Sequence, residues 1–186
     1  MPLKIAVPDL ATTTLAVIDL QSKLLPAMAD RDRLIDRCRL LINGVSALNG
    51  RIIVSEQYPK GLGGTVPEIQ SVLPEKTPIV SKTAFSVFGE AQFRRELAGT
   101  ATQSLIFCGV EAHVCVFQSA LDAVNAGYHV ILAADAVDSR KDSDRDLALQ
   151  ELRSIGVAVL SAEAILFWLL KNAAAPEFKT ISKLVK

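Results

Sequence analysis

The residue of this sequence best suited to chemistry is Cys115. It follows an apolar run, a glycine and a short polar loop in the segment 105–119, Leu-Ile-Phe-Cys-Gly-Val-Glu-Ala-His-Val-Cys-Val-Phe-Gln-Ser. An amphipathic helical pattern starts there, and a thiol at a helix N-terminus faces unpaired N–H groups and the positive end of the helix dipole. We therefore expect a thiolate nucleophile that titrates well below the free-thiol value of about 8.5. The plainer alternative is a small core hydrophobe, which we expect for Cys38 and Cys108.

Two charged residues stand at the ends of other apolar runs. Asp19 ends the run 13–19, and Lys82 ends the run 78–82. The carboxyl ends of parallel strands meet at one edge of a sheet, so both residues would lie near Cys115. An acid, an ammonium and a thiol together form a set that can attack a carbonyl covalently. Singly, each has a plainer interpretation: the aspartate as a helix cap, the lysine as a solvated side chain.

The elements that must position these residues alternate between strand and helix. Strands are expected at residues 13–19, 51–55, 78–82, 104–108, 129–134 and 157–160. Helices are expected at 32–48, 90–97, 114–126, 143–155 and 161–170, with a short one starting at a capping box, 65–68. Strands that are apolar on both faces predict a three-layer α/β/α doubly wound fold with a mainly parallel six-stranded sheet. Residues 1–186 are expected to form one domain.

Composition excludes several function classes. The chain has 20 basic and 20 acidic residues, and this balance gives no field for a nucleic acid. We expect no membrane segment, because the longest apolar run is far below the roughly 20 residues that span a bilayer. Three cysteines without a framework spacing and the lack of a secretory signal favour a cytoplasmic protein. The basic tail 177–186 is expected to form a solvated helix face.

Three motifs carry a resemblance to a known family. They are Ala-Val-Ile-Asp-Leu-Gln at 16–21, Ser-Lys-Thr-Ala-Phe-Ser at 81–86, and Cys-Gly-Val-Glu-Ala-His-Val-Cys at 108–115. They resemble the signatures of the isochorismatase-like cysteine hydrolases. The segments 55–68 and 176–186 resemble the isochorismatase domain-containing proteins, whose substrates are poorly defined. The resemblance implies that Asp19, Lys82 and Cys115 form a catalytic triad and that a non-proline cis peptide joins Val110 to Glu111.

The expected reaction is hydrolysis of a C–N bond in a small amide or amide-like molecule. Cys115 attacks the carbonyl, Asp19 takes the thiol proton and returns it to the leaving amine, and Lys82 stabilises the charges. The backbone N–H groups of Glu111 and Cys115 bind the oxyanion, and water then hydrolyses the thioester. The substrate is a small molecule, and the protein is expected to be a homo-oligomer.

Two departures from the family pattern narrow the activity. Nicotinamidases resemble this chain but have an Asp-x-His pattern after the second strand, where this chain has Ser-Glu-Gln-Tyr at 55–58. With only His113 and His129 in the sequence, we expect no metal and no other cofactor. True isochorismatases lack the cysteine, so Cys115 argues against isochorismate as the substrate.

Four loop residues are candidates for the substrate pocket: Gln21, Gln57, Tyr58 and Phe85. Substrate contact and ordinary loop packing are equally good interpretations of them. His113 lies two residues before the cysteine and is expected to line the pocket or to point outward.

Two other classes of function remain open. The chain could be an interaction protein without turnover, with the apolar helix 161–170 as its interface. It could also be a redox sensor that uses Cys115 as its reactive thiol, although Cys108 is poorly placed to resolve an oxidised form.

Overall fold

The computed structural model describes residues 8–186. Its strands are β1 (Thr13–Ile18), β2 (Arg51–Gln57), β3 (Ile79–Lys82), β4 (Ser104–Val110), β5 (His129–Asp138) and β6 (Ala158–Leu160). Its α-helices are α1 (Arg31–Ala47), α2 (Pro59–Leu62), α3 (Pro67–Gln70), α4 (Ala91–Ala98), α5 (Phe117–Asn125), α6 (Asp142–Ser154), α7 (Ala162–Leu170) and α8 (Phe178–Leu184). Three 3-10 turns, η1 (Leu10–Thr12), η2 (Leu25–Ala27) and η3 (Val87–Gly89), and one π-helical turn, η4 (Ala112–Val116), complete the described part.

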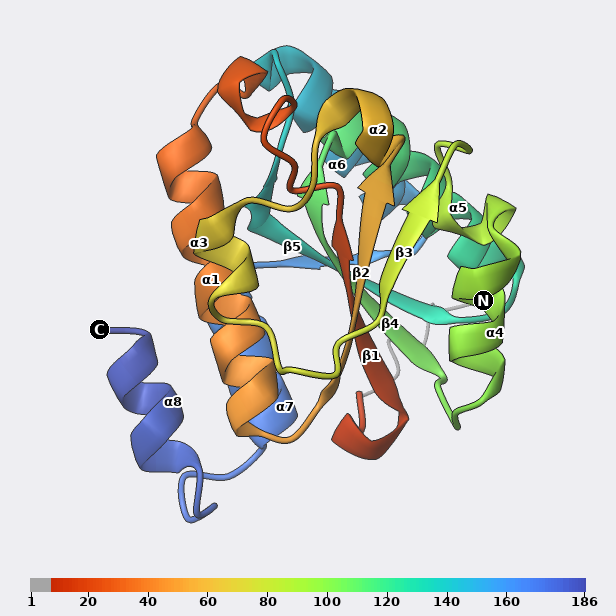
Figure 1. Cartoon of the computed structure of the whole chain (residues 1–186). Helices are drawn as coiled ribbons and strands as arrows, with labels where there is room; N and C mark the ends of the chain where they lie inside the picture. The colour runs from red at the N-terminus through yellow and green to blue at the C-terminus, as the bar shows by residue number, and fades with distance from the viewer. Residues whose placement is uncertain (1–7) are drawn as a thin grey trace.

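The strands form one sheet in the order β3-β2-β1-β4-β5-β6, and each neighbouring pair is parallel (Figure 1). The three-layer α/β/α fold with a six-stranded parallel sheet is therefore confirmed. The chain moves outward from β1 through β2 to β3, and β4 then returns to the other side of β1. In such sheets the ligand crevice lies outside the carboxyl ends of the strands where the order reverses, here between β1 and β4.

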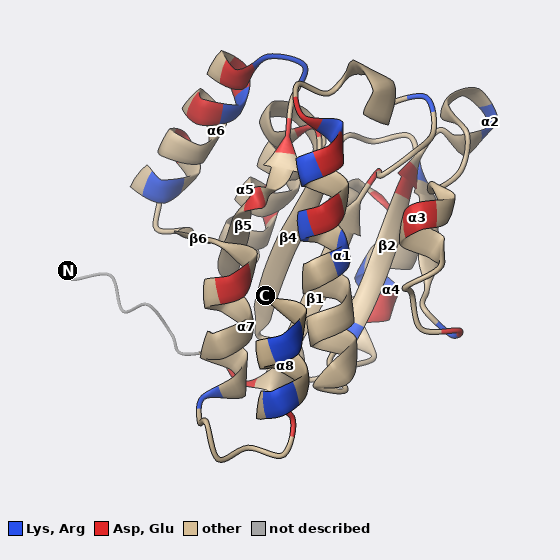
Figure 2. Ribbon diagram, turned by 90° about the vertical axis from the view of Figure 1, so that its left-hand side faces the viewer, with Lys and Arg blue, Asp and Glu red and all other residues tan. Residues whose placement is uncertain are grey.

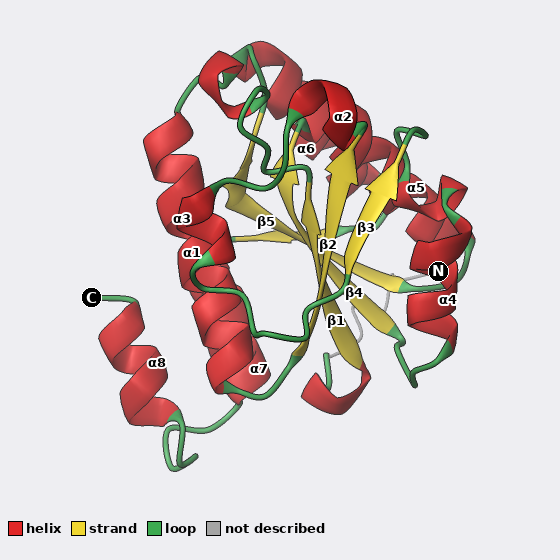
Figure 3. Ribbon diagram, in the orientation of Figure 1, coloured by secondary structure: helices red, strands yellow, loops and turns green. Residues whose placement is uncertain are grey.

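Helices cover both faces of the sheet (Figure 3). Alternate residues of β1 point to opposite faces, as the period of a strand requires. Leu15 and Val17 join a buried cluster with α1, α7 and Ile181 of α8. Ala16 and Ile18 join a second buried cluster with α4, α5 and α6. Because both faces of the strands are buried, their sequences are mainly continuous apolar runs.

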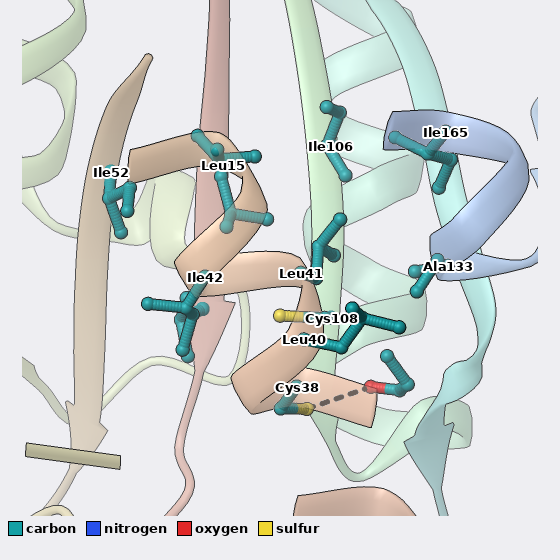
Figure 4. Packing of buried hydrophobic residues seen from close by; sticks show 14 of the residues in the cluster. Leu15, Cys38, Leu40, Leu41, Ile42, Ile52, Ile106, Cys108, Ala133 and Ile165 are labelled. Carbon is teal, nitrogen blue, oxygen red and sulfur yellow. Dashed lines mark hydrogen bonds between the residues drawn. The ribbon is translucent and has the colours of Figure 1, made fainter. Parts of the chain in front are cut away.

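Two of the three cysteines lie in the first cluster, as the sequence predicts. Cys38 on α1 and Cys108 on β4 are fully buried (Figure 4). The Cys38 thiol donates to the Ala136 carbonyl at 3.3 Å, and burial raises its pKa well above the ordinary value. These thiols are core residues.

Several element boundaries differ from the sequence prediction. β2 continues two residues further, through Gln57, and β5 continues four residues further, through Asp138. The capping box predicted at 65–68 is wrong: α3 begins at Pro67 without a side-chain cap. The Thr65 N–H and hydroxyl donate instead to Glu56, both at 2.7 Å, because the preceding loop folds back onto the end of β2. The segment 56–64, for which the sequence pattern predicts neither a strand nor a helix, contains the short helix α2.

The C-terminal helices pack within the chain. Ser161 caps α7 by accepting from the Ala164 N–H at 3.2 Å, and Ile165 and Leu166 are fully buried. Ile181 buries α8 against the same cluster, while Lys179 and Lys183 are exposed. The core of this chain therefore accounts for the apolar character of α7 without a second subunit. None of the described helices is long and apolar enough to cross a membrane.

Candidate active site

The strand order brings the predicted acid to the crevice. Asp19 directly follows β1, and its N–H donates to the Ser55 carbonyl of β2 at 3.1 Å. Its φ of 52° is left-handed, a conformation that aspartate tolerates better than most residues. The chain turns sharply at this point, so the carboxylate is directed beneath the loops at the edge of the sheet.

Asp19 and Lys82 form a buried ion pair. Lys82 Nζ lies 2.7 Å from Asp19 Oδ2, and both side chains are fully buried. Ser55 Oγ donates to Asp19 Oδ1 at 2.7 Å. Burial raises the pKa of Asp19 above its ordinary range, although the Lys82 charge and its hydrogen bond act to lower it. The carboxylate is thus a stronger base than a solvated aspartate.

The Lys82 ammonium has more acceptors than protons. Besides its ion-pair contact with Asp19 Oδ2, it donates to Gln57 Oε1 at 2.6 Å, to the Phe85 carbonyl at 3.0 Å and to the Ala84 carbonyl at 3.3 Å. An ammonium has three protons. These neighbours therefore engage the cation fully, which fixes its position and explains how a lysine can be buried at the end of β3.

Cys115 lies in the π-helical turn η4, and α5 begins two residues later. The Glu111 carbonyl accepts from the Val114 N–H at 3.1 Å and from the Val116 N–H at 3.2 Å. An α-helical turn would pair that carbonyl with the Cys115 N–H. The π turn takes the Cys115 N–H out of this pairing and directs the thiol toward Gln57 Oε1, 3.9 Å from Sγ.

The expectation of a resting thiolate at Cys115 is wrong. Burial raises the pKa of this thiol to about 12; the Asp19 charge also raises it, and the Lys82 charge lowers it. The residue is only 7 % exposed. The sequence argument relied on a helix N-terminus, but Cys115 lies inside a π turn, where desolvation and the Asp19 charge raise the pKa of its thiol. The side chain at rest is a neutral thiol beside a buried carboxylate.

The segment between β4 and η4 runs close to β1. Gly109 has a φ of 111°, and a Cβ there would lie 2.0 Å from the Ile18 carbonyl oxygen, so only glycine fits. The bond between Val110 and Glu111 is a cis peptide. This path places the Glu111 N–H and η4 directly beyond the end of β1.

Two residues that the sequence reasoning missed secure this segment. Arg140 donates to Glu111 Oε2 through its backbone N–H at 3.2 Å and its Nε at 3.0 Å. The hydroxyl of Ser139 lies 2.9 Å from His113 Nδ1, so the imidazole is engaged away from the thiol. Sequence reasoning ended β5 at residue 134; with the observed end at Asp138, these loop residues fall at the same sheet edge as the triad.

The four pocket candidates divide into two pairs. Gln21 is fully buried and binds backbone, and Gln57 contacts Lys82 and Cys115 directly. Tyr58 and Phe85 are 54 % and 53 % exposed on the loops around the ion pair. Tyr58 has a left-handed φ of 38°. The loops that carry these two aromatic residues therefore form the open side of the site.

A hollow of about 350 Å³ adjoins this open side. It lies between the loop after β2 and the end of β3, and is lined by Tyr58, Pro59, Lys60, Ser81, Lys82, Thr83 and Glu90. Within residues 8–186, no group of three or more His, Cys, Asp or Glu side chains is arranged to hold a metal ion.

Comparisons with known proteins identify the family and support the fold. The family model described as the isochorismatase domain matches residues 13–164. Isochorismatase domain-containing protein 2A of Mus musculus is 35% identical over 178 residues, which cover 94% of this chain and 83% of that protein. Isochorismatase domain-containing protein 1 of Salmo salar is 38% identical over 178 residues; the match covers 95% of this chain but only 62% of that protein. The solved structure of the MAR1 ribonuclease from Caenorhabditis elegans superposes with a TM-score of 0.92 at 36% identity, covering 97% of this chain and 92% of that one.

Proposed function

The chain belongs to the isochorismatase family of hydrolases, and from this premise we propose that it is a cysteine hydrolase of small amides or amide-like molecules. The convergence of Asp19, Lys82 and Cys115 at one sheet edge carries the proposal. A neutral thiol beside a desolvated carboxylate forms a nucleophile–base pair, and the ammonium holds the base in place.

The first step transfers the thiol proton to Asp19 as the sulfur attacks the carbonyl carbon. Asp19 Oδ2 contacts Lys82 but has no well-formed hydrogen bond with any residue in the described part of the chain. This oxygen is the acceptor we assign to the proton. The raised pKa of Asp19, caused by burial, improves it as a base. The S–C bond forms while the carbonyl electrons move onto oxygen.

The oxyanion would be bound by the backbone N–H groups of Glu111 and Cys115. Both lie on the turn that passes the end of β1, and the π turn frees the Cys115 N–H from the usual pairing with residue 111. One such donor contributes about 3–4 kcal/mol to lowering the barrier. Collapse of the intermediate breaks the C–N bond, Asp19 returns its proton to the amine, and water hydrolyses the thioester.

The charges of the site favour a neutral substrate. The Lys82 ammonium is already shared among a carboxylate, an amide oxygen and two carbonyls. It therefore has no proton to spare for a carboxylate or phosphate on the substrate. A small uncharged amide, ureide or carbamoyl compound needs no free cation, and Tyr58 and Phe85 would give it an apolar rim.

RNA hydrolysis is a second candidate, because the C. elegans relative is described as a ribonuclease. The distribution of charged residues argues against RNA hydrolysis by this chain. Basic and acidic residues are mixed along α1 and α6, and the 20 basic residues balance 20 acidic ones (Figure 2). A polyanion is usually bound by a continuous basic surface.

The test is a hydrolysis screen of small amides, ureides and carbamoyl compounds, with an RNA oligonucleotide added to the panel. Wild type, Cys115→Ala and, as a control for loss of another thiol, Cys38→Ala are compared. We expect wild type and Cys38→Ala to release amine and form an acyl adduct visible by intact-mass spectrometry, and Cys115→Ala to do neither. Amine release that survives Cys115→Ala, absence of both turnover and adduct, or cleavage of RNA alone would each overturn the proposal.

A further inference from the structure

Gln57 occupies a position between the two charged partners and the nucleophile that the mechanism does not use. Its Oε1 accepts from Lys82 Nζ at 2.6 Å and faces Cys115 Sγ at 3.9 Å. Its Nε2 donates to the Thr83 carbonyl at 2.9 Å, which fixes which end of the amide points into the site. Both polar atoms of the side-chain amide are thus hydrogen-bonded within the protein.

The backbone of Gln57 is held just as firmly. The Gln21 side chain accepts from the Gln57 N–H at 2.7 Å and donates to the Gln57 carbonyl at 2.9 Å. Gln21 is fully buried and also donates to the Gly63 carbonyl at 2.6 Å. One glutamine therefore continues the sheet pairing beyond β1 and fixes the position of the other.

An amide oxygen at this position acts on the thiol in two ways. It can only accept, so it stabilises a protonated sulfur and opposes a thiolate. It also competes with a sulfur anion for the Lys82 ammonium, whose three protons already face four acceptors. Both effects have the same direction and favour the neutral form of Cys115.

We propose that Gln57 is a positioning residue that keeps Cys115 as a neutral thiol in the resting enzyme, so that the nucleophile forms only as the proton passes to Asp19. The inference rests on the proposed function in taking Cys115 as the nucleophile. It assigns Gln57 to the triad and not to substrate recognition. A neutral thiol is also less reactive than a thiolate toward adventitious electrophiles and oxidants.

The other charged groups around the thiol are already accounted for. Asp19 and Lys82 face it from the ends of β1 and β3, and their charges act on its pKa in opposite directions. On its own turn, Glu111 is paired with Arg140, and the His113 ring is engaged by the Ser139 hydroxyl. Gln57 is the neutral residue whose removal changes the contacts of Lys82 and the sulfur together.

The test measures the rate of Cys115 alkylation by iodoacetamide between pH 6 and 11, followed by mass spectrometry of the peptide that carries Cys115. Because the thiol pKa of about 12 lies above this range, a shift of the midpoint is determined from the alkylation rate on the rising limb, which is proportional to the thiolate fraction. We expect Gln57→Leu to lower the midpoint by about one pH unit, which is roughly tenfold faster alkylation at pH 8. Gln57→Glu adds a carboxylate beside the sulfur and should raise the midpoint. Gln118→Leu, an exposed glutamine on α5, is the matched control and should leave it unchanged.

If Gln57→Leu does not fold, Gln57→Asn replaces it, because the shorter side chain withdraws its oxygen from both contacts but keeps the backbone pairing to Gln21. An unchanged or raised midpoint in the folded Leu or Asn variant overturns the inference. The alkylation assay requires no substrate. A lowered midpoint without amide turnover would therefore support the role of Gln57 and reject the proposed function. Amide turnover with an unchanged midpoint would support the proposed function and reject the role of Gln57.

Discussion

Replacing Lys82 by methionine tests the buried ion pair most directly. Methionine keeps the length of the aliphatic chain, so little packing is lost. The change leaves the Asp19 carboxylate in the interior with the Ser55 hydroxyl as its hydrogen-bond donor. Because both side chains of the pair are fully buried at 2.7 Å, we expect the free energy of unfolding at neutral pH to fall by about 3–5 kcal/mol.

This loss should depend on pH with a definite sign. Burial already raises the pKa of Asp19, and the charge and hydrogen bond of Lys82 oppose that rise. Without Lys82 the folded-state pKa rises further, above the unfolded value of about 3.9. A raised folded-state pKa gives stability that is present below the unfolded pKa and is lost as pH rises through the folded pKa. Lys82→Met should therefore be less destabilised at pH 4.5 than at pH 7.5.

The assay is urea unfolding at both pH values, followed by the fluorescence of Trp168, the single tryptophan. Wild type, Lys82→Met, Asp19→Asn and the double variant form a cycle, with exposed Lys183→Met as the control. We expect the double variant to recover about 1–3 kcal/mol relative to the sum of the single losses, because it leaves no unpaired charge. A loss under about 1 kcal/mol in Lys82→Met at both pH values, or strict additivity, would refute the reasoning.

Two further predictions concern the backbone and the assembly. Gly109→Ala should cost at least about 3 kcal/mol in urea unfolding, since its Cβ would meet the Ile18 carbonyl at 2.0 Å, whereas Gly127→Ala, with a φ of 88° and open space around it, should cost only about 1–2 kcal/mol; equal losses would contradict the close approach. We also predict a homo-oligomer, and a monomer in light scattering at micromolar concentration would reject it. Three exposed hydrophobic side chains gather around the outer strand β3 and its neighbouring loops: Tyr58, Ile79 and Phe85.

The sequence was sufficient to predict the fold and the convergence of the triad residues. Continuous apolar runs alternating with helical patterns leave few arrangements other than a covered parallel sheet, and parallel strands end at one edge. Asp19 and Lys82 could thus be placed together without any coordinates, and the structure puts them 2.7 Å apart. The role of the three residues as a catalytic triad remains a prediction.

The details that depend on loops could not be read from the sequence. Periodicity detects a helix after β4, but a single π turn of five residues is too short to be recognised by its period. The partners Ser139 and Arg140 were missed because β5 shifts register beside Gly109 and runs on past its predicted end. Gln21 is a pocket candidate by sequence because its loop should border the crevice, whereas its amide replaces a strand in pairing with Gln57.

The raised pKa of Cys115 changes what the site must achieve. A cysteine that rests as a thiolate needs no base for attack, but a thiol whose pKa is about 12 must lose its proton during the attack itself. The nearby acceptor with a raised pKa is Asp19, and burial is the largest cause of both shifts, so desolvation makes the carboxylate a stronger base at the place where the thiol proton must leave. In a site of this kind the ion pair with Lys82 does not compete with catalysis. It keeps the carboxylate ionised in an interior that would otherwise protonate it, and so preserves a base for the thiol.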